Sequence, residues 1–390
     1  MKKIIVTLLI FFITTGCSNY REMNNLGIVS AFGIQIKDDK FLTTAQLINV
    51  NNKTETVANQ SPIYLISAEG ETVFESIRNM HKKSAKSLFF AHTKIVIIDK
   101  TILENKEYLD SFIDLLARDM EMSLSFFIIT CNEVSINDIL STLSLVESFT
   151  AVDLENTIKN SLKRSGTGYE LISKDFFSKY LSPGINNVYT NINITKNKNE
   201  KNNISILEIA NAEIFTYVDG LLSFDKEGNM IYINDEYSKT LNIIQNNVKN
   251  INYTIECGNE IFTIETQFID FGFKEDLKNN KIKVEGKILT AIAEYNCEYD
   301  LNKNQDLKKI KNLISNRLES DIKDLIKFAQ ENQNDFIGIG KYIYKNNPKY
   351  FDFKNKSWDK EGFPVLNYDV KVDVNLYKQG NLKGTVKHEK

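Results

Sequence analysis

Apolar and polar residues follow two different periods along this chain, and the changes of period divide it into strands and helices. A period of about 3.6 residues marks an amphipathic helix, whereas alternation or a short continuous apolar run marks a strand. In the N-terminal half this pattern predicts strands at residues 26–36, 41–50, 63–66, 93–98 and 123–130, and helices at residues 71–86, 102–118 and 147–163. A turn at Asp38-Asp39 joins the first two strands, and Ser135 followed by Asp138 begins a further helix. Because strands and helices alternate, this half is predicted to be a mixed α/β unit.

The C-terminal half carries longer strand patterns and one long helix. Strands are predicted at residues 204–218, 221–224, 251–256, 261–271, 281–299 and 368–376, and helices at residues 234–248 and 306–330. The apolar stripe of the 306–330 helix is interpreted as a core face. Long alternating strands beside helices are typical of an antiparallel sheet covered by helices, so we expect an α+β fold here.

The chain of 390 residues is too long for one compact core, so two to three compact units are expected. Residues 195–203, TKNKNEKNN, contain no apolar side chain and read as an exposed linker or hairpin tip. We place the main boundary there. The N-terminal mixed α/β region then covers residues 26–196, which could divide again near residues 135–150, and the C-terminal α+β domain covers residues 204–385.

The first residues have the form of a lipoprotein leader. Lys2 and Lys3 precede an apolar run of about ten residues, which is roughly half the length of a membrane-spanning helix. Thr14, Thr15, Gly16 and Cys17 follow this run, similar to the bacterial lipobox, whose cysteine receives a diacylglyceryl group. Residues 1–16 are therefore predicted to be the signal peptide, Cys17 the lipidated residue and residues 17–25 a tether. The alternative is an ordinary secretory leader with a coincidental cysteine.

Charge and composition argue against a nucleic-acid partner. The chain has 48 Lys and Arg against 51 Asp and Glu, a formal net charge of −3. A phosphate-binding face normally shows a basic excess, whereas the basic pairs at residues 82–83 and 308–309 are short and read as solvated surface.

Four cysteines leave an odd number if Cys17 carries lipid. Cys131 ends an apolar run and is expected to be a buried free thiol. Cys257 and Cys297 both lie in strand patterns and could form one disulfide. Free buried thiols are the preferred interpretation, because a domain of this size needs no covalent cross-link.

No catalytic, cofactor or metal site can be assembled from the sequence. The three histidines, His81, His92 and His388, have no helical metal-binding spacing, and His92 is the one expected to be buried in the core. The Gly338-x-Gly340-Lys341 stretch lacks the first glycine of a phosphate loop. Trp358 is interpreted as a packing anchor. We therefore expect a protein that is not an enzyme and needs no cofactor or metal.

Taken in order, several blocks resemble the Ger(x)C family, the lipoprotein C subunits of spore germinant receptors. After the lipobox, Arg21, Glu22 and Met23 occupy the family's opening segment. The other similar blocks are residues 71–78, 88–94 and 112–119, Ala212 to Phe215 with Glu236, and Phe336 to Gly340 with Trp358 and Phe363. Asn211 and Ser223 stand where the family usually has glycine.

The resemblance implies a fold of three mixed α/β domains and no enzymatic activity. It also implies a place on the outer leaflet of the spore's inner membrane, beside two integral membrane subunits. These are the A-type and B-type subunits. One of the two resembles amino-acid transporters, and the other carries a large soluble domain. The sequence thus predicts a membrane-tethered receptor subunit required to trigger germination. A solute-binding lipoprotein of a transporter is the alternative, and a wall-active hydrolase ranks third.

Overall fold

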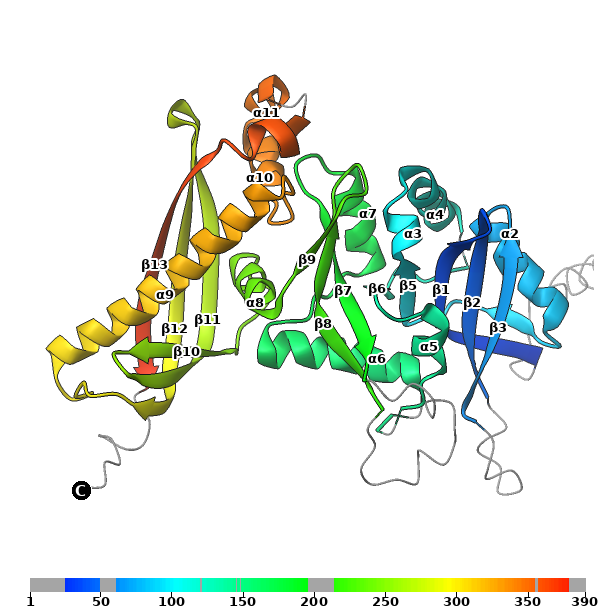
Figure 1. Ribbon diagram of the computed structural model, residues 1–390, viewed down its shortest axis with the longest axis horizontal. Coiled ribbons are helices and arrows are strands. Elements are labelled where there is room, and N and C mark those ends of the chain that lie inside the picture. Colours follow the sequence, from blue (N-terminus) through cyan, green and yellow to red (C-terminus); the bar gives the residue numbers. More distant parts are fainter. Residues whose placement is uncertain are drawn as a thin grey trace, which may run out of the picture.

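Two β-sheets lie one after the other along the long axis of the molecule, with helices packed on them (Figure 1). The computed structural model describes residues 25–49, 61–119, 121–144, 146–147, 149–195, 214–354 and 357–378. The N-terminal half of the described chain lies at one end of the molecule and the C-terminal sheet at the other.

The first sheet has nine strands in the order β3-β2-β1-β5-β6-β7-β8-β9, with β4 beside β1. Its strands are β1 (Leu26–Lys37), β2 (Lys40–Ile48), β3 (Ile63–Gly70), β4 (Ser87–Phe89), β5 (Ile95–Asp99), β6 (Phe127–Cys131), β7 (Asn187–Ile194), β8 (Thr216–Phe224) and β9 (Met230–Ile233). The central pairs β1–β5, β5–β6 and β6–β7 are parallel, and the flanking pairs are antiparallel hairpins. The sheet therefore contains both parallel and antiparallel pairs, and it lies in a unit of alternating strands and helices, as predicted.

The β1–β2 hairpin confirms the predicted turn. Asp38 and Asp39 have φ angles of 49° and 59°, and Lys37 pairs with Lys40 across them. Two consecutive residues of positive φ are the geometry of the two-residue turns that match the twist of paired strands. Aspartate tolerates this conformation better than most residues, which explains the turn at this position.

Helices cover both faces of the first sheet. They are α2 (Val73–Met80), the 3₁₀ turn η3 (His81–Lys83), α3 (Lys100–Leu103), α4 (Lys106–Arg118), α5 (Ile136–Ser141), α6 (Thr150–Asn160) with the π-helical turn η4 (Ser161–Ser165), and α7 (Ser173–Leu181). In β5, Val96 and Ile98 face the core beneath α2 and α4, whereas Ile95 and Ile97 face α5 and α6. A strand covered on both faces needs apolar residues at every position, which is the pattern seen at residues 95–98.

The second sheet contains β10 (Asn252–Cys257), β11 (Glu260–Asp276), β12 (Lys281–Asn296) and β13 (Asn367–Lys378), in that order. The 28-residue helix α9 (Asn304–Glu331) crosses one face of this sheet (Figure 1). Its stripe from Ile310 to Ala329 is buried against the sheet, so the predicted core role of this helix is confirmed. Before the second sheet lies α8 (Asp235–Ile244), and between α9 and β13 lie α10 (Ile339–Asn346), α11 (Pro348–Lys354) and the π-helical turn η8 (Trp358–Gly362).

The predicted α+β, multi-unit fold class is confirmed, with one difference in strand direction. β10, β11 and β12 form antiparallel hairpins, but β13 pairs parallel with β12. The long crossover through α9, α10 and α11 returns the chain to the starting end of β12, because a parallel partner cannot be reached by a hairpin.

The strand pairing continues the first sheet beyond the predicted linker. β7 and β8 are antiparallel neighbours, so residues 196–213 connect two strands of one sheet, and β9 extends that sheet further. The division between the two sheets falls between β9 and β10, and the domain boundary at residues 195–203 stays a prediction. A polar stretch is typical of a hairpin connection as well as of an interdomain linker, and the sequence alone does not separate the two.

Candidate functional site

Cys17, the residue predicted to carry lipid, lies outside the described residues, which begin at Asn25. The remaining cysteines have assigned states. Cys131 is a buried free thiol in β6, as predicted, and burial raises the pKa of that thiol to about 12. A thiol that stays protonated is a poor nucleophile, so Cys131 is chemically inert at neutral pH. Lipidation of Cys17 stays a prediction.

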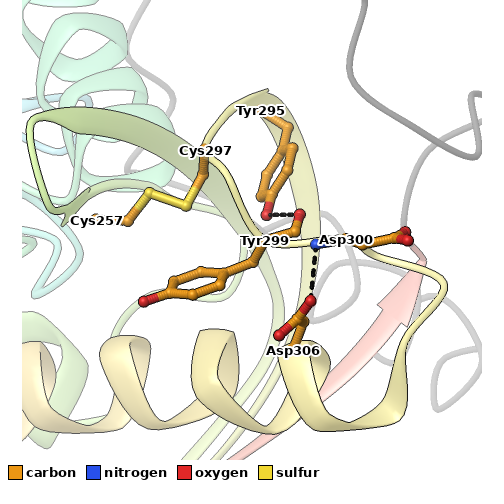
Figure 2. Close-up of a disulfide and its surroundings, with 6 residues drawn as sticks. All are labelled: Cys257, Tyr295, Cys297, Tyr299, Asp300 and Asp306. Atoms are coloured by element: carbon orange, nitrogen blue, oxygen red, sulfur yellow. Dashed lines mark hydrogen bonds between the residues drawn. A yellow bond between two sulfur atoms is a disulfide. The ribbon is translucent and has the colours of Figure 1, made fainter.

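Cys257 and Cys297 form a disulfide, so the preferred prediction of two free thiols is wrong (Figure 2). Cys257 ends β10 and Cys297 directly follows β12, and their Cα atoms are 6.2 Å apart. Both side chains are buried. The hairpin register brings these two strand ends together across 40 residues, and strand patterns alone do not reveal which strand ends meet.

Hydrogen bonds next to the disulfide hold the connection from β12 to α9. The Tyr295 hydroxyl donates to the Tyr299 carbonyl over 2.6 Å, and the Asp300 N–H donates to the Asp306 carboxylate over 3.2 Å (Figure 2). Asp306 lies in the first turn of α9, where a carboxylate is favoured by the helix dipole. The disulfide and these bonds together fasten the start of α9 to the sheet that it covers.

A fully buried carboxylate, Asp335, lies in the loop before α10, where the second half of the chain meets the first sheet. Its Oδ1 accepts hydrogen bonds from the N–H groups of Gly338 (2.8 Å) and Ile339 (3.1 Å). Its Oδ2 accepts from the N–H of Gly340 (2.6 Å) and from the Trp358 indole N–H (2.8 Å). The N–H groups that open α10 are thus satisfied by a side chain. A phosphate loop needs these groups free.

The loop around Asp335 is bonded directly to the first sheet. Asn186, immediately before β7, donates its backbone N–H to the Asp335 carbonyl over 3.0 Å, and its side-chain amide to Asn334 over 3.1 Å. From β8, the Ser223 hydroxyl donates to the same Asn334 oxygen over 3.1 Å. We call the residues Asn186, Ser223, Asn334, Asp335, Trp358 and Asp359 the sheet junction.

The sheet junction places two carboxyl groups in a desolvated environment. Burial raises the pKa of Asp335 to about 7, against the opposing effect of its four N–H donors. Burial also raises the pKa of Asp359, which accepts hydrogen bonds from the Asp335 N–H and from Asn186. The negative charge of Asp359 further disfavours ionisation of Asp335.

Two of the blocks named in the sequence, Phe336 to Gly340 and Trp358, lie apart in the chain and meet at the sheet junction. The closing block, Phe336 to Gly340 with Trp358, surrounds Asp335, and Ser223 of β8 donates to the neighbouring Asn334. Trp358 packs between Phe351 and Phe363, which confirms its predicted role as an anchor. Asp335 itself was missed, although an acidic residue three positions before a glycine that opens a helix is a usable signal for a buried cap.

Two open hollows carry charged linings. One, of about 370 Å³, is lined by α8, β10, α9 and residues 165–167. Its Asp321 carboxylate already accepts hydrogen bonds from Arg317 (2.9 Å) and from the Tyr253 hydroxyl (2.7 Å). The other, of about 560 Å³, lies over β11, β12 and β13 beside Gly272 and Gly286.

The histidines do not form a site in the described part of the chain. His92 was predicted to be buried, and this is wrong: its side chain is exposed and packs edge-on against Phe89. It lies in a turn just before β5 rather than in the strand. Burial lowers the pKa of His81. His388 lies outside the described residues.

Within the described ranges, no group of three or more His, Cys, Asp or Glu side chains is arranged to hold a metal ion. In the same residues, none of the helices combines the length and the apolar character that a membrane crossing requires.

Two family models match the chain in succession. The spore germination protein N-terminal domain matches residues 19–194, and the C-terminal model, described as spore germination B3/GerAC like, matches residues 219–380. The gap between the two matches contains residues 195–203, the polar segment at which we predicted the domain boundary. The strands on either side of this segment, β7 and β8, are paired with each other.

Curated relatives are similar over nearly the whole length. Spore germination protein KC of Bacillus subtilis (strain 168) is 24% identical over 400 residues, covering 99% of this chain and 97% of that protein. The putative spore germination protein YfkR of the same organism is 21% identical, covering 99% and 98%. The crystal structure of the GerBC protein has a similar fold, with a TM-score of 0.54 at 13% identity, covering 89% of this chain and 96% of that one.

Proposed function

Since this chain belongs to the Ger(x)C family of spore germination proteins, the C subunits of germinant receptors, we propose that it is a lipoprotein subunit required for a nutrient to trigger germination. The observation that carries the proposal is the similarity over 99% of the chain to a spore germination protein. The shared fold with the GerBC protein supports it.

The anchor in this proposal is a diacylglyceryl group on Cys17. The states of the other cysteines support that assignment, because two are joined in a disulfide and Cys131 is a buried thiol of raised pKa. A disulfide also favours an oxidising compartment, which fits exposure on the outer leaflet of the spore's inner membrane. Two acyl chains hold a protein firmly to a bilayer, whereas one chain binds marginally.

The partners in this proposal are the integral membrane A-type and B-type subunits of the receptor. Binding would come from docking of folded surfaces, and the lipid would raise the local concentration of this subunit beside its partners. The role in this proposal is non-catalytic, and the two buried carboxyl groups of the sheet junction, Asp335 and Asp359, support it because both are held by hydrogen bonds within the fold.

Replacing Cys17 tests the anchor. The Cys17→Ala variant is expected to leave the membrane fraction and to reduce nutrient-triggered germination, because the leader would no longer supply a lipidated thiol. Cell fractionation with immunoblotting and the loss of spore optical density after nutrient addition measure the two effects. The matched variant Cys131→Ala removes a buried thiol and should stay in the membrane fraction.

Unchanged membrane attachment of Cys17→Ala would disprove the anchor. Normal germination of spores lacking this subunit would disprove the receptor role. Tight binding of an amino acid or sugar by the isolated subunit in calorimetry would instead favour the solute-binding lipoprotein of a transporter.

A further inference from the structure

A short stretch between α2 and β4 concentrates positive charge in an otherwise acidic chain. Residues 78–86, which we call the basic segment, contain Arg78, Lys82, Lys83 and Lys86 and no Asp or Glu. The nearest acidic residues in the sequence are Glu75 and Asp99, and the whole chain has a net charge of −3. The positive charge is therefore local rather than a general property of the surface.

The basic side chains are available to solvent. Arg78, Lys82 and Lys83 are exposed, and Lys86 is half-buried. In the described part of the chain, none of the four forms an ion pair with a carboxylate. Lys83 donates to the Ser67 carbonyl over 2.8 Å.

Two neighbours of the basic segment on α2, Phe74 and Glu75, make contacts that leave its positive charge in place. The Arg78 guanidinium lies 4.8 Å from the ring centre of Phe74, whose side chain is 47% exposed. The Glu75 carboxylate accepts the Glu71 N–H at the start of α2.

The basic segment lies beside the start of the chain that leads to the anchor. β4 pairs parallel with the beginning of β1, with Leu26 opposite Ser87. A Cβ atom built on Gly27 would lie 3.6 Å from the Cβ of Lys86. Leu26 follows Cys17 by nine positions, and a fully extended chain of nine steps reaches at most about 32 Å. A lipid on Cys17 would therefore hold the basic segment within reach of the bilayer surface.

We propose that the basic segment binds the anionic phospholipid headgroups of the membrane, and that this contact orients the first sheet against the bilayer. The proposal rests on lipidation of Cys17, because the tether supplies the proximity. Electrostatic attraction between basic side chains and an anionic leaflet acts within about one Debye length, 8–10 Å at physiological salt. Exposed lysines and an exposed aromatic ring suit this interface, where charged heads and amphipathic rings meet lipid headgroups.

Lysine footprinting of the full lipidated protein tests the proposal. The protein is reconstituted on phosphatidylcholine vesicles and on vesicles of phosphatidylcholine with 30% phosphatidylglycerol, and each lysine's acetylation rate is measured by mass spectrometry. Lys82, Lys83 and Lys86 are expected to react at least about threefold more slowly on the anionic vesicles. About 1 M salt should remove the protection, because the Debye length falls to about 3 Å.

The other basic pair, Lys308-Lys309, provides an internal control and a matched variant. It lies at the start of α9, at the opposite end of the molecule from α2 (Figure 1), and its lysines should react equally on both vesicle types. The double variant Lys82→Glu/Lys83→Glu should abolish the protection of Lys86. The variant Lys308→Glu/Lys309→Glu carries the same charge change and should retain that protection.

Three outcomes separate this proposal from the anchor on which it rests. Protein that fails to attach to either vesicle type would disprove lipid anchoring. Protein that attaches to both but shows equal reactivity of the basic segment on each would overturn the headgroup contact alone. Equal slowing of Lys308-Lys309 would also overturn it, because the protection would then be unspecific.

Discussion

The sheet junction makes the stability of the protein depend on pH through Asp335. The carboxyl group is fully buried, and burial raises its pKa from 3.8 to about 7. In the unfolded chain this group loses its proton near pH 4, whereas the folded protein keeps the proton up to about pH 7. The folded state therefore binds more protons between these values. The contribution of Asp335 to the free energy of unfolding is fully present below pH 4 and is lost as the pH rises through about 7.

The size of the effect follows from the pKa of the folded state. Below pH 7, each pH unit changes the free energy of unfolding by about 1.4 kcal/mol for one proton. Integrated from pH 5 to pH 8 with a folded pKa of about 7, the loss is about 3 kcal/mol. The four N–H donors favour the ionised carboxylate and so oppose the effect of burial. The measured loss in free energy of unfolding therefore shows whether burial or hydrogen bonding dominates the pKa of Asp335.

The comparison of wild type with Asp335→Asn isolates this group, because asparagine cannot titrate. Urea unfolding at pH 5, 6, 7 and 8 gives the free energy of each protein, and the fluorescence of Trp358, the chain's single tryptophan, reports the junction itself. The stability of wild type relative to the variant should fall by about 3 kcal/mol over this range. Asp324→Asn, at an exposed position on α9, should leave the profile unchanged. A flat difference between wild type and Asp335→Asn would refute the reasoning and show that the donors keep the carboxylate ionised throughout.

Three further predictions concern stability. Reduction with dithiothreitol should lower the free energy of unfolding of wild type by about 4 kcal/mol, because the disulfide closes a 40-residue loop. Reduction should have no effect on the variant Cys257→Ala/Cys297→Ala. An equal effect on wild type and on this variant would contradict the disulfide. Gly340→Ala should lower the free energy of unfolding in urea by more than about 2 kcal/mol, since the added Cβ would lie 2.3 Å from the Trp358 indole nitrogen. The control Gly272→Ala, whose Cβ would have no neighbour within 4 Å, should lie within about 0.5 kcal/mol of wild type. Ser135→Ala should cost about 1 kcal/mol by the same measurement, because it removes the cap of α5; a change below about 0.3 kcal/mol would show that the cap is not stabilising.

Local patterns predicted those parts of the fold in which neighbouring residues determine the structure. The stripe of α9, the Ser135 cap and the Asp38-Asp39 turn each depend on side chains within one element or one connection. The continuous apolar run at residues 93–98 also predicted a strand, and β5 is buried on both faces. These features are set by period and by turn chemistry, both of which are visible in a single sequence.

Features that depend on distant pairings could not be predicted in the same way. The disulfide requires the register of β10, β11 and β12, and the parallel placement of β13 requires the path of the whole crossover. The membership of β8 in the first sheet depends on its pairing with β7 across a polar connection. Asp335 was missed although the N–H groups of Gly338, Ile339 and Gly340 lie within five residues of it; only its fourth donor, Trp358, is distant, 23 residues further along.

The parallel pairing of β13 with β12 has a consequence for the order in which the protein can fold. β10 to β12 are neighbours in the chain and can form as soon as they emerge, but Lys281 pairs with Asn367 across α9, α10 and α11. A chain that is delivered from its N-terminus cannot complete the second sheet until its last strand arrives, and closing such a distant contact is slow. Until then β12 presents an unpaired edge that can associate with other chains. Truncations that remove only the last two dozen residues should therefore produce aggregation rather than a shortened but soluble subunit.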